Sequence, residues 1–175
     1  IKPTPSIGGV GLIKDYNKMI TMDFKELDNI VLVIGKTEGH IDQSLFARNI
    51  LDEKNGPPPE ISLFNEKNNG ETLLKLIDSN LVKSAHDVSI GGIITAVSKM
   101  CIKGNKGINL KKPKFLINEI EYFFAEDQGR YIIEISKSIN WFFNLSESPG
   151  LLKLKFCFDW KGVPCEVGFG WDHMS

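Results

Sequence analysis

Two polar, glycine-containing stretches hold the residue types that could bind a phosphate. SAHDVSIGG, residues 84–92, and GKTEGHIDQS, residues 35–44, each fall between a strand-like run and a helix-like pattern. Backbone N–H groups at the start of a helix favour an anion, and glycine lets a ligand approach the backbone closely. The residues that we predict to bind phosphate or nucleotide are Gly39, His40, Gln43, Ser44, Ser84, His86, Ser89, Gly91 and Gly92.

Carboxylates in the same regions could hold a metal ion. Asp87 lies within SAHDVSIGG, and Glu126 lies in a third polar segment, FFAEDQGR, before a strand-like run. Because Mg²⁺ prefers oxygen ligands, we predict Asp87 and Glu126 as metal ligands. Ordinary helix caps, tight packing at the glycines and an acidic surface turn explain the same patterns, so the residues alone leave both interpretations open.

The cysteines offer no comparable chemistry. Cys101, Cys157 and Cys165 are odd in number, widely separated and without an activating partner at motif spacing. This argues against nucleophilic catalysis, a disulfide framework or a zinc site. Cys101 falls at an apolar position of a helical pattern, which favours a small core residue.

Composition limits the kind of protein. The 175 residues are 42% hydrophobic and 25% charged, as in one globular domain. The 21 basic and 22 acidic residues leave a net charge of −1, which gives no excess for binding nucleic acid or an anionic membrane. Without a long apolar run or a signal-peptide pattern, we expect a cytoplasmic protein.

Strand-like and helix-like segments alternate as far as residue 136, and must position these polar stretches. The expected elements are a strand over 29–35, a helix over 43–53, a helix over 62–79 interrupted near 68–70, a strand ending near 85, a helix from about 91, and strands over 107–110 and 130–136. In the helix from about 91, Ile93, Val97 and Met100 belong to one apolar stripe, which predicts a core-facing side.

Five motifs in order resemble one known family. They are PTPSIGGVGLI (3–13), GKTEGHIDQSLFARNI (35–50), GPPPEISL (56–63), SAHDVSIGGIITAVSKM (84–100) and FFAEDQGRYIIEI (123–135). Together they are similar to the C-terminal domain type of the aminoimidazole ribonucleotide synthetase superfamily, over residues 3 to about 138. The resemblance implies an α+β fold with a mixed β-sheet covered by helices, partly ferredoxin-like.

The resemblance also implies a reaction and partners. The related ligase uses ATP and Mg²⁺ to activate the amide oxygen of formylglycinamide ribonucleotide, then adds ammonia from a glutaminase subunit, giving the amidine, ADP and phosphate in purine biosynthesis. In the family's first C-terminal-type domain, the positions that match Gln43, Asp87 and 126–128 contact substrate and Mg²⁺. This chain resembles the second copy, where they would line an auxiliary site, so we predict no catalytic residue.

We expect a synthetase-related domain over 1–140 and a divergent, truncated or frame-shifted tail over 141–175, which does not resemble the family's final strand and helix. Activity would then belong to an assembly with the remaining synthetase domains and the glutaminase subunit. One alternative is a noncatalytic folded remnant that forms a homo-oligomer through surfaces that once faced sister domains. Another is a related small-molecule binding module.

Overall fold

Four strands form the sheet at the centre of the molecule. The computed structural model describes residues 6–110, 118–139 and 151–155. The strands are β1 (Ile30–Ile34), β2 (Val82–Val88), β3 (Arg130–Ile135) and β4 (Leu151–Lys155), in the order β2-β3-β1-β4. The α+β prediction is confirmed, but every pair among these described strands is antiparallel, so the expectation of a mixed sheet is corrected.

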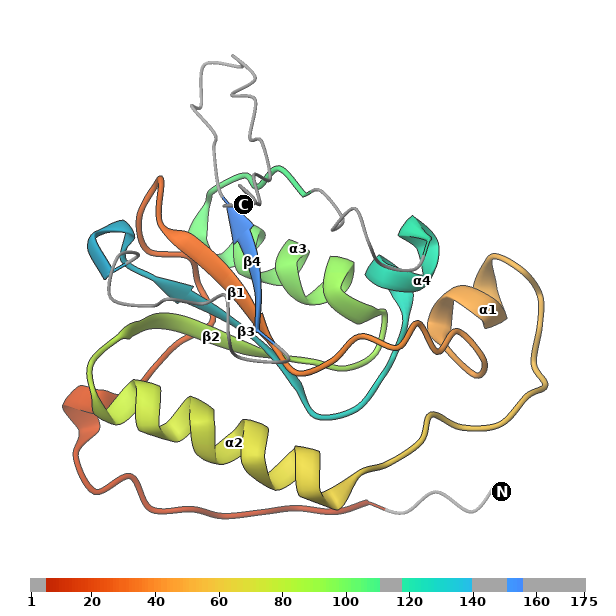
Figure 1. The fold of residues 1–175 in the computed structure, drawn as a ribbon, viewed down its shortest axis with the longest axis horizontal. Helices are drawn as coiled ribbons and strands as arrows, with labels where there is room; N and C mark the ends of the chain where they lie inside the picture. Colours follow the sequence, from red (N-terminus) through yellow and green to blue (C-terminus); the bar gives the residue numbers. More distant parts are fainter. Residues whose placement is uncertain (1–5, 111–117, 140–150, 156–175) are drawn as a thin grey trace, which may run out of the picture.

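Helices cover both faces of this sheet (Figure 1). The helical elements are η1 (Tyr16–Lys18), α1 (Leu45–Asn49), α2 (Leu63–Asp78), α3 (Gly92–Gly104), α4 (Glu119–Phe124) and η2 (Lys137–Ile139). α2 packs on one face, and α3 with α4 packs on the other. None of the helices in the described ranges is long and apolar enough to cross a membrane.

The all-apolar sequence of β1, IVLVI, follows from its place between two helical layers. Val31 and Val33 join the cluster on the α3 side, which includes Ile93 and Met100. Ile30, Leu32 and Ile34 join the opposite cluster, beneath α2. Because successive side chains point to opposite faces, a strand covered on both sides needs apolar residues throughout. The predicted strand over 29–35 is therefore confirmed.

α2 is continuous through 68–70, so the expected interruption is wrong. Tertiary contacts offset the weak helix propensity of this stretch. The Asn69 side-chain amide donates to the Gly129 carbonyl at 2.9 Å. The later apolar residues Leu73 and Leu76 pack against the cluster under the sheet.

α3 confirms the helix expected from about residue 91. Ile93, Val97 and Met100 are buried against the sheet, as the apolar stripe predicts. Cys101 packs at the edge of that cluster, and partial burial raises the pKa of its thiol to about 11.

Two local expectations need correction, and one helix was not expected. The predicted helix over 43–53 shortens to α1, since Asp52 adopts a left-handed φ of 55° that a continuing helix does not allow. Residues 107–110 form no strand, because they lie over α3 rather than beside the sheet. The unexpected helix is α4, which begins after the Asn118 cap.

The domain boundary near residue 140 stays a prediction. Residues 140–150 and 156–175 lie outside the described ranges. Between them, β4 pairs with β1 from Leu151 opposite Ile34 to Lys155 opposite Ile30.

Candidate functional site

The acidic loop, defined as Ala125–Gly129, connects α4 to β3 and meets the two predicted phosphate-binding regions. The β1–α1 turn (residues 35–44) ends at the Ser44 cap of α1, and the β2–α3 turn (residues 89–91) leads into α3. The acidic loop contacts both turns through its two carboxylates. This region is therefore the structural counterpart of the site expected from the sequence.

Glu126 joins the start of α1 to the β2–α3 turn through one oxygen. Its Oε1 accepts hydrogen bonds from the backbone N–H of Leu45 at 2.7 Å and from that of Gly91 at 2.8 Å. Its own backbone N–H donates to the His40 carbonyl at 3.2 Å. Both N–H groups belong to the starts of helices, where an anion is favoured. A carboxylate of the protein is thus bound where the sequence predicts a phosphate.

Asp127 contacts the β1–α1 turn in the same manner. Its Oδ2 accepts from the backbone N–H groups of Glu38 at 3.0 Å and Gly39 at 3.1 Å, and its Oδ1 accepts from that of His40 at 3.2 Å. The side chain is almost fully buried. Consecutive N–H groups that converge on one anion form a typical anion-binding concavity. Here that concavity holds a carboxylate of the chain itself.

Arg130 fixes the acidic loop from within the core. Its guanidinium donates from Nε to the Asp127 carbonyl at 3.1 Å, from Nη2 to the Ala125 carbonyl at 2.7 Å and from Nη1 to the Thr37 hydroxyl at 3.0 Å. Burial lowers the pKa of Arg130, and the nearby Asp127 carboxylate opposes that shift. Planar guanidinium geometry suits this multiple contact.

Gly92 lets the start of α3 approach the acidic loop. Its φ is +68°, and an added Cβ would lie 2.6 Å from the carbonyl oxygens of both Ala125 and Phe123. Only glycine adopts this conformation at so close an approach without strain. The predicted glycine at this position thus packs against protein backbone.

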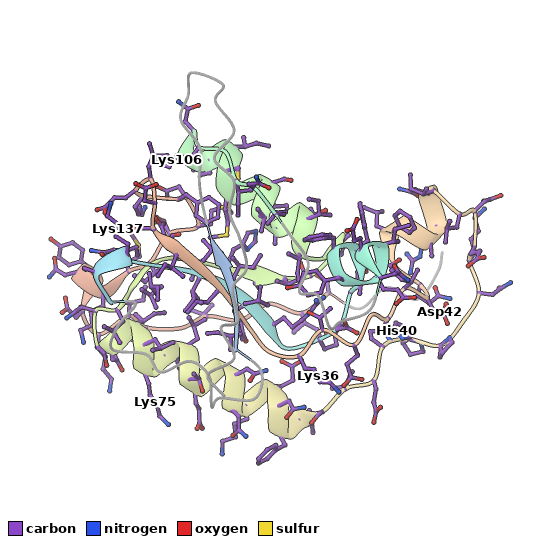
Figure 2. All side chains as sticks on the ribbon, turned by 45° about the horizontal axis from the view of Figure 1, so that its top comes forward. Lys36, His40, Asp42, Lys75, Lys106 and Lys137 are labelled. Atoms are coloured by element: carbon purple, nitrogen blue, oxygen red, sulfur yellow. The ribbon has the colours of Figure 1, made fainter. Side chains whose placement is uncertain are left out.

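Three predicted side chains in the β1–α1 turn bind protein atoms. The Ser44 hydroxyl is buried and accepts from the Ala47 backbone N–H at 3.1 Å, which caps α1. Gln43 Nε2 donates to the Lys54 and Gly56 carbonyls, and His40 Nε2 lies 3.0 Å from the Pro57 carbonyl. Figure 2 shows His40 and Asp42 beside α1. Gln43 and His40 thus hold the segment that follows α1, and Ser44 holds the start of that helix.

The predicted residues of β2 lie in a strand rather than a turn. Ser84 is fully buried and donates its hydroxyl to Glu134 Oε2 at 2.8 Å, so it does not join the site. His86 Nδ1 is 2.9 Å from Asp87 Oδ1, and His86 Nε2 is buried without a hydrogen-bond partner in the described part of the chain. Ser89 is exposed, and its carbonyl accepts from Gly92 N–H at 3.0 Å.

The two predicted metal ligands already have partners within the protein. Glu126 Oε1 already accepts two N–H donors, whose partial positive charge disfavours a cation at that oxygen. Asp87 pairs instead with His86. Within the described ranges, no group of three or more His, Cys, Asp or Glu side chains is placed to hold a metal ion.

Sequence reasoning did not anticipate the parts played by Asp127 and Arg130. Asp127 belongs to the acidic segment that the sequence singles out, but its acceptance of three N–H groups depends on a distant turn. Arg130 opens the apolar run of β3, directly after the carboxylates. An arginine at such a position is the signal that could have indicated a buried cation holding the loop.

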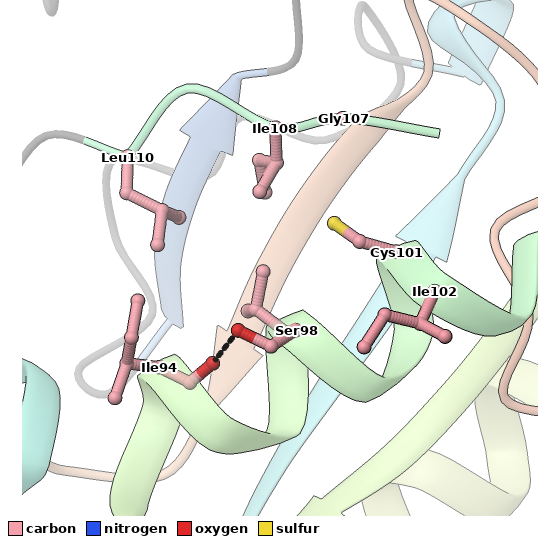
Figure 3. Close-up of a pocket in the computed structure, with 8 residues that line it drawn as sticks. Ile94, Ser98, Cys101, Ile102, Gly107, Ile108 and Leu110 are labelled. Atoms are coloured by element: carbon pink, nitrogen blue, oxygen red, sulfur yellow. Dashed lines mark hydrogen bonds between the residues drawn. The ribbon is translucent and has the colours of Figure 1, made fainter. Parts of the chain in front are cut away.

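A separate groove of about 460 Å³ lies between α3 and residues 107–110 (Figure 3). Its lining is mainly apolar and includes Ile94, Ile102 and Leu110, and none of the predicted site residues lines it. The Ser98 hydroxyl in this groove donates to the Ile94 carbonyl at 2.7 Å. The described residues that line this groove therefore carry none of the charged groups that phosphate chemistry requires.

Comparisons with known proteins identify similar chains. The family model for AIR synthase related protein, C-terminal domain, matches residues 28–155. Phosphoribosylformylglycinamidine synthase subunit PurL from Pelagibacter ubique (strain HTCC1062) is 79% identical over 137 residues, which cover 78% of this chain and 19% of that protein. The chain spans about a fifth of the length of the curated relatives that it matches.

Two solved structures share the fold. T. maritima PurL complexed with FGAR aligns with a TM-score of 0.56 and 24% identity, covering 70% of this chain and 22% of that one. T. maritima PurL complexed with ATP aligns with a TM-score of 0.52 and 18% identity, covering 80% of this chain and 23% of that one.

Proposed function

This chain belongs to the AIR synthase related protein, C-terminal domain family, and from that premise we propose that it is one domain of a phosphoribosylformylglycinamidine synthase in purine biosynthesis. The observation that carries the proposal is the 79% identity to PurL of Pelagibacter ubique over 137 residues. Because the chain spans about a fifth of such relatives, the activity belongs to an enzyme completed by further domains.

The reaction of the completed enzyme converts formylglycinamide ribonucleotide, ATP and ammonia to the amidine, ADP and phosphate. The FGAR and ATP complexes of T. maritima PurL support this substrate and nucleotide for the whole enzyme. Bound ATP would supply the phosphoryl group that activates the amide oxygen, and Mg²⁺ would neutralise its phosphates. The proposed partners of this chain are the remaining synthetase domains and a glutaminase subunit. The proposed location is the cytoplasm.

The contribution of this chain is to present a preformed surface to those other domains. The nucleotide- and metal-binding roles of its turns stay predictions, and the acidic loop argues against them because five of their N–H groups already bind carboxylates. Catalysis of this type depends on positioning and charge stabilisation, so a domain can contribute without supplying a reacting group.

Complementation tests the proposal. The chain is co-expressed with a PurL subunit of the Pelagibacter type from which the matching fifth has been removed, and amidine formation is followed with ammonia and ATP. We expect turnover well above that of either part alone. If the chain unfolds cooperatively and co-purifies with the remainder but adds no turnover, the proposed function is wrong.

Exposed apolar residues favour a second candidate, a noncatalytic module that forms a homo-oligomer. At the start of α2, Leu63 is 79% exposed and Phe64 is 74% exposed, and Ile61 just before them is 63% exposed. Clustered apolar exposure marks surfaces that another protein covers. Sedimentation across the micromolar range distinguishes the candidates, since a clean monomer would rule out self-association.

A further inference from the structure

We propose that the acidic loop serves as an internal anion: Glu126 and Asp127 take the backbone N–H groups that would otherwise receive a phosphate, and Glu126 is the positioning residue that joins both turns. The proposal rests on the contacts of the loop and goes beyond the proposed function. It also explains why Glu126, a predicted Mg²⁺ ligand, accepts backbone N–H groups instead.

Glu126 bridges the start of α1 and the β2–α3 turn. Leu45 begins α1 and Gly91 caps α3, and these helices follow different strands, yet both residues donate to Oε1, at 2.7 and 2.8 Å. Short N–H bonds to a carboxylate are charge-assisted and stronger than neutral ones. Because one oxygen binds both, the position of the start of α1 depends on that of the β2–α3 turn.

Asp127 binds a second group of backbone N–H donors, distinct from those that bind Glu126. It accepts from three successive residues, 38–40, and is only 7% exposed. A ligand phosphate at this concavity would have to displace a buried carboxylate. That displacement would leave Asp127 without its three N–H partners, at a high cost in desolvation.

The loop is also held from behind, which makes its occupancy of the turns a fixed feature. Arg130 donates to the carbonyls on either side of Glu126, those of Ala125 and Asp127. Gly92 packs directly against the Ala125 and Phe123 carbonyl oxygens. Moving the loop outward would leave the buried Arg130 guanidinium without its carbonyl partners. The carboxylates therefore remain in place.

Hydrogen exchange on the full 175-residue chain tests the bridge, by comparing the unsubstituted chain with Glu126→Gln and Glu126→Ala. In Glu126→Ala, the Leu45 and Gly91 amides should both lose protection, by about tenfold or more. Glu126→Gln should retain most of the protection of both amides, because its side-chain carbonyl can accept the same bonds. Loss at one amide alone, or at neither, would overturn the role of Glu126.

The matched control is Glu38→Gln, which removes a nearby exposed carboxylate that pairs with Lys36 at 2.7 Å. It should leave exchange at Leu45 and Gly91 unchanged. If Glu126→Ala fails to fold, Glu126→Gln still tests the bridge: protection retained at both amides, or lost together at both without global unfolding, supports a shared acceptor, and loss at one amide alone overturns it.

Ligand addition tests the internal anion itself. Inorganic phosphate and Mg²⁺-ADP are added in turn to the unsubstituted chain, and exchange is followed at residues 38–40, 45 and 91. We expect no change at these amides, because the carboxylates already hold them. A ligand-dependent change there would overturn the proposal, whereas the enzymatic complementation result would be unaffected by either outcome.

Discussion

The Ser84 hydroxyl donates a hydrogen bond of 2.8 Å to the carboxylate of Glu134, and both residues are completely buried. Glu134 also accepts from the backbone N–H groups of Lys25 and Glu26 and from the Asn29 side-chain amide. Four donors around one carboxylate satisfy a charge that would otherwise be costly to bury. Ser84 thus belongs to the interior of the sheet, although its sequence context resembles a phosphate-binding turn.

Ser84→Ala should lower the free energy of unfolding by about 1–2 kcal/mol, because it removes one donor from a buried carboxylate. Urea unfolding measures the change. Ser98→Ala is the control, since that exposed hydroxyl donates only to a carbonyl within its own helix, and its effect should stay within about 0.5 kcal/mol. Equal effects of the two substitutions would contradict the structural importance of Ser84.

Arg130→Lys should destabilise the chain by about 2–4 kcal/mol, because lysine cannot reproduce the contacts of the buried guanidinium with two carbonyls and Thr37. Thermal and urea unfolding measure the loss. Arg48→Lys is the matched control on the surface, where the guanidinium contacts Gln43 at 3.3 Å, and it should change stability by less than about 0.5 kcal/mol. A tolerated Arg130→Lys would show that the acidic loop does not need the multiple contacts of the guanidinium.

Gly92→Ala should destabilise the chain by more than about 2 kcal/mol, because the new Cβ would meet two carbonyl oxygens at 2.6 Å in a left-handed conformation. Gly70→Ala should have the opposite effect on the free energy of unfolding. It lies within α2 in open space apart from the Tyr131 hydroxyl at 3.7 Å, so alanine should stabilise the helix by about 0.5–1 kcal/mol. Urea unfolding of both variants checks the contrast in sign.

Asp23 should make a small contribution to stability that disappears in acid. Hydrogen bonds from Lys25 and Thr21 lower the pKa of Asp23 from 3.8 to about 2. A lowered folded-state pKa stabilises the fold above the unfolded-state value, and that contribution is lost as pH falls from about 4 to about 2. Since the pair is partly exposed, the effect should stay below about 1 kcal/mol.

Urea unfolding of the unsubstituted chain and Asp23→Asn checks this pH dependence. The difference in free energy of unfolding should be present at about pH 6 and should narrow at about pH 2.5. A difference that is constant across this range would assign the effect to packing rather than to the charge of Asp23.

The local sequence was sufficient to predict the elements whose side chains are buried in a regular pattern along the chain. β1 is apolar throughout because both of its faces are covered, and the stripe of α3 follows from a single buried side. The family resemblance was likewise carried by short ordered motifs, and the family is confirmed by the match over residues 28–155. These features depend on neighbours in the chain or on simple periodicity.

Tertiary structure alone decided what the polar turns contact. The sequence places N–H donors at 38–40, 45 and 91 and carboxylates at 126 and 127, but it does not show that the second group binds the first. That pairing arises because β3 lies beside both β1 and β2, which brings the loop before β3 to the ends of its neighbours. Hydrogen bonds act over about 3 Å, so their partners are set by strand order and not by spacing along the chain.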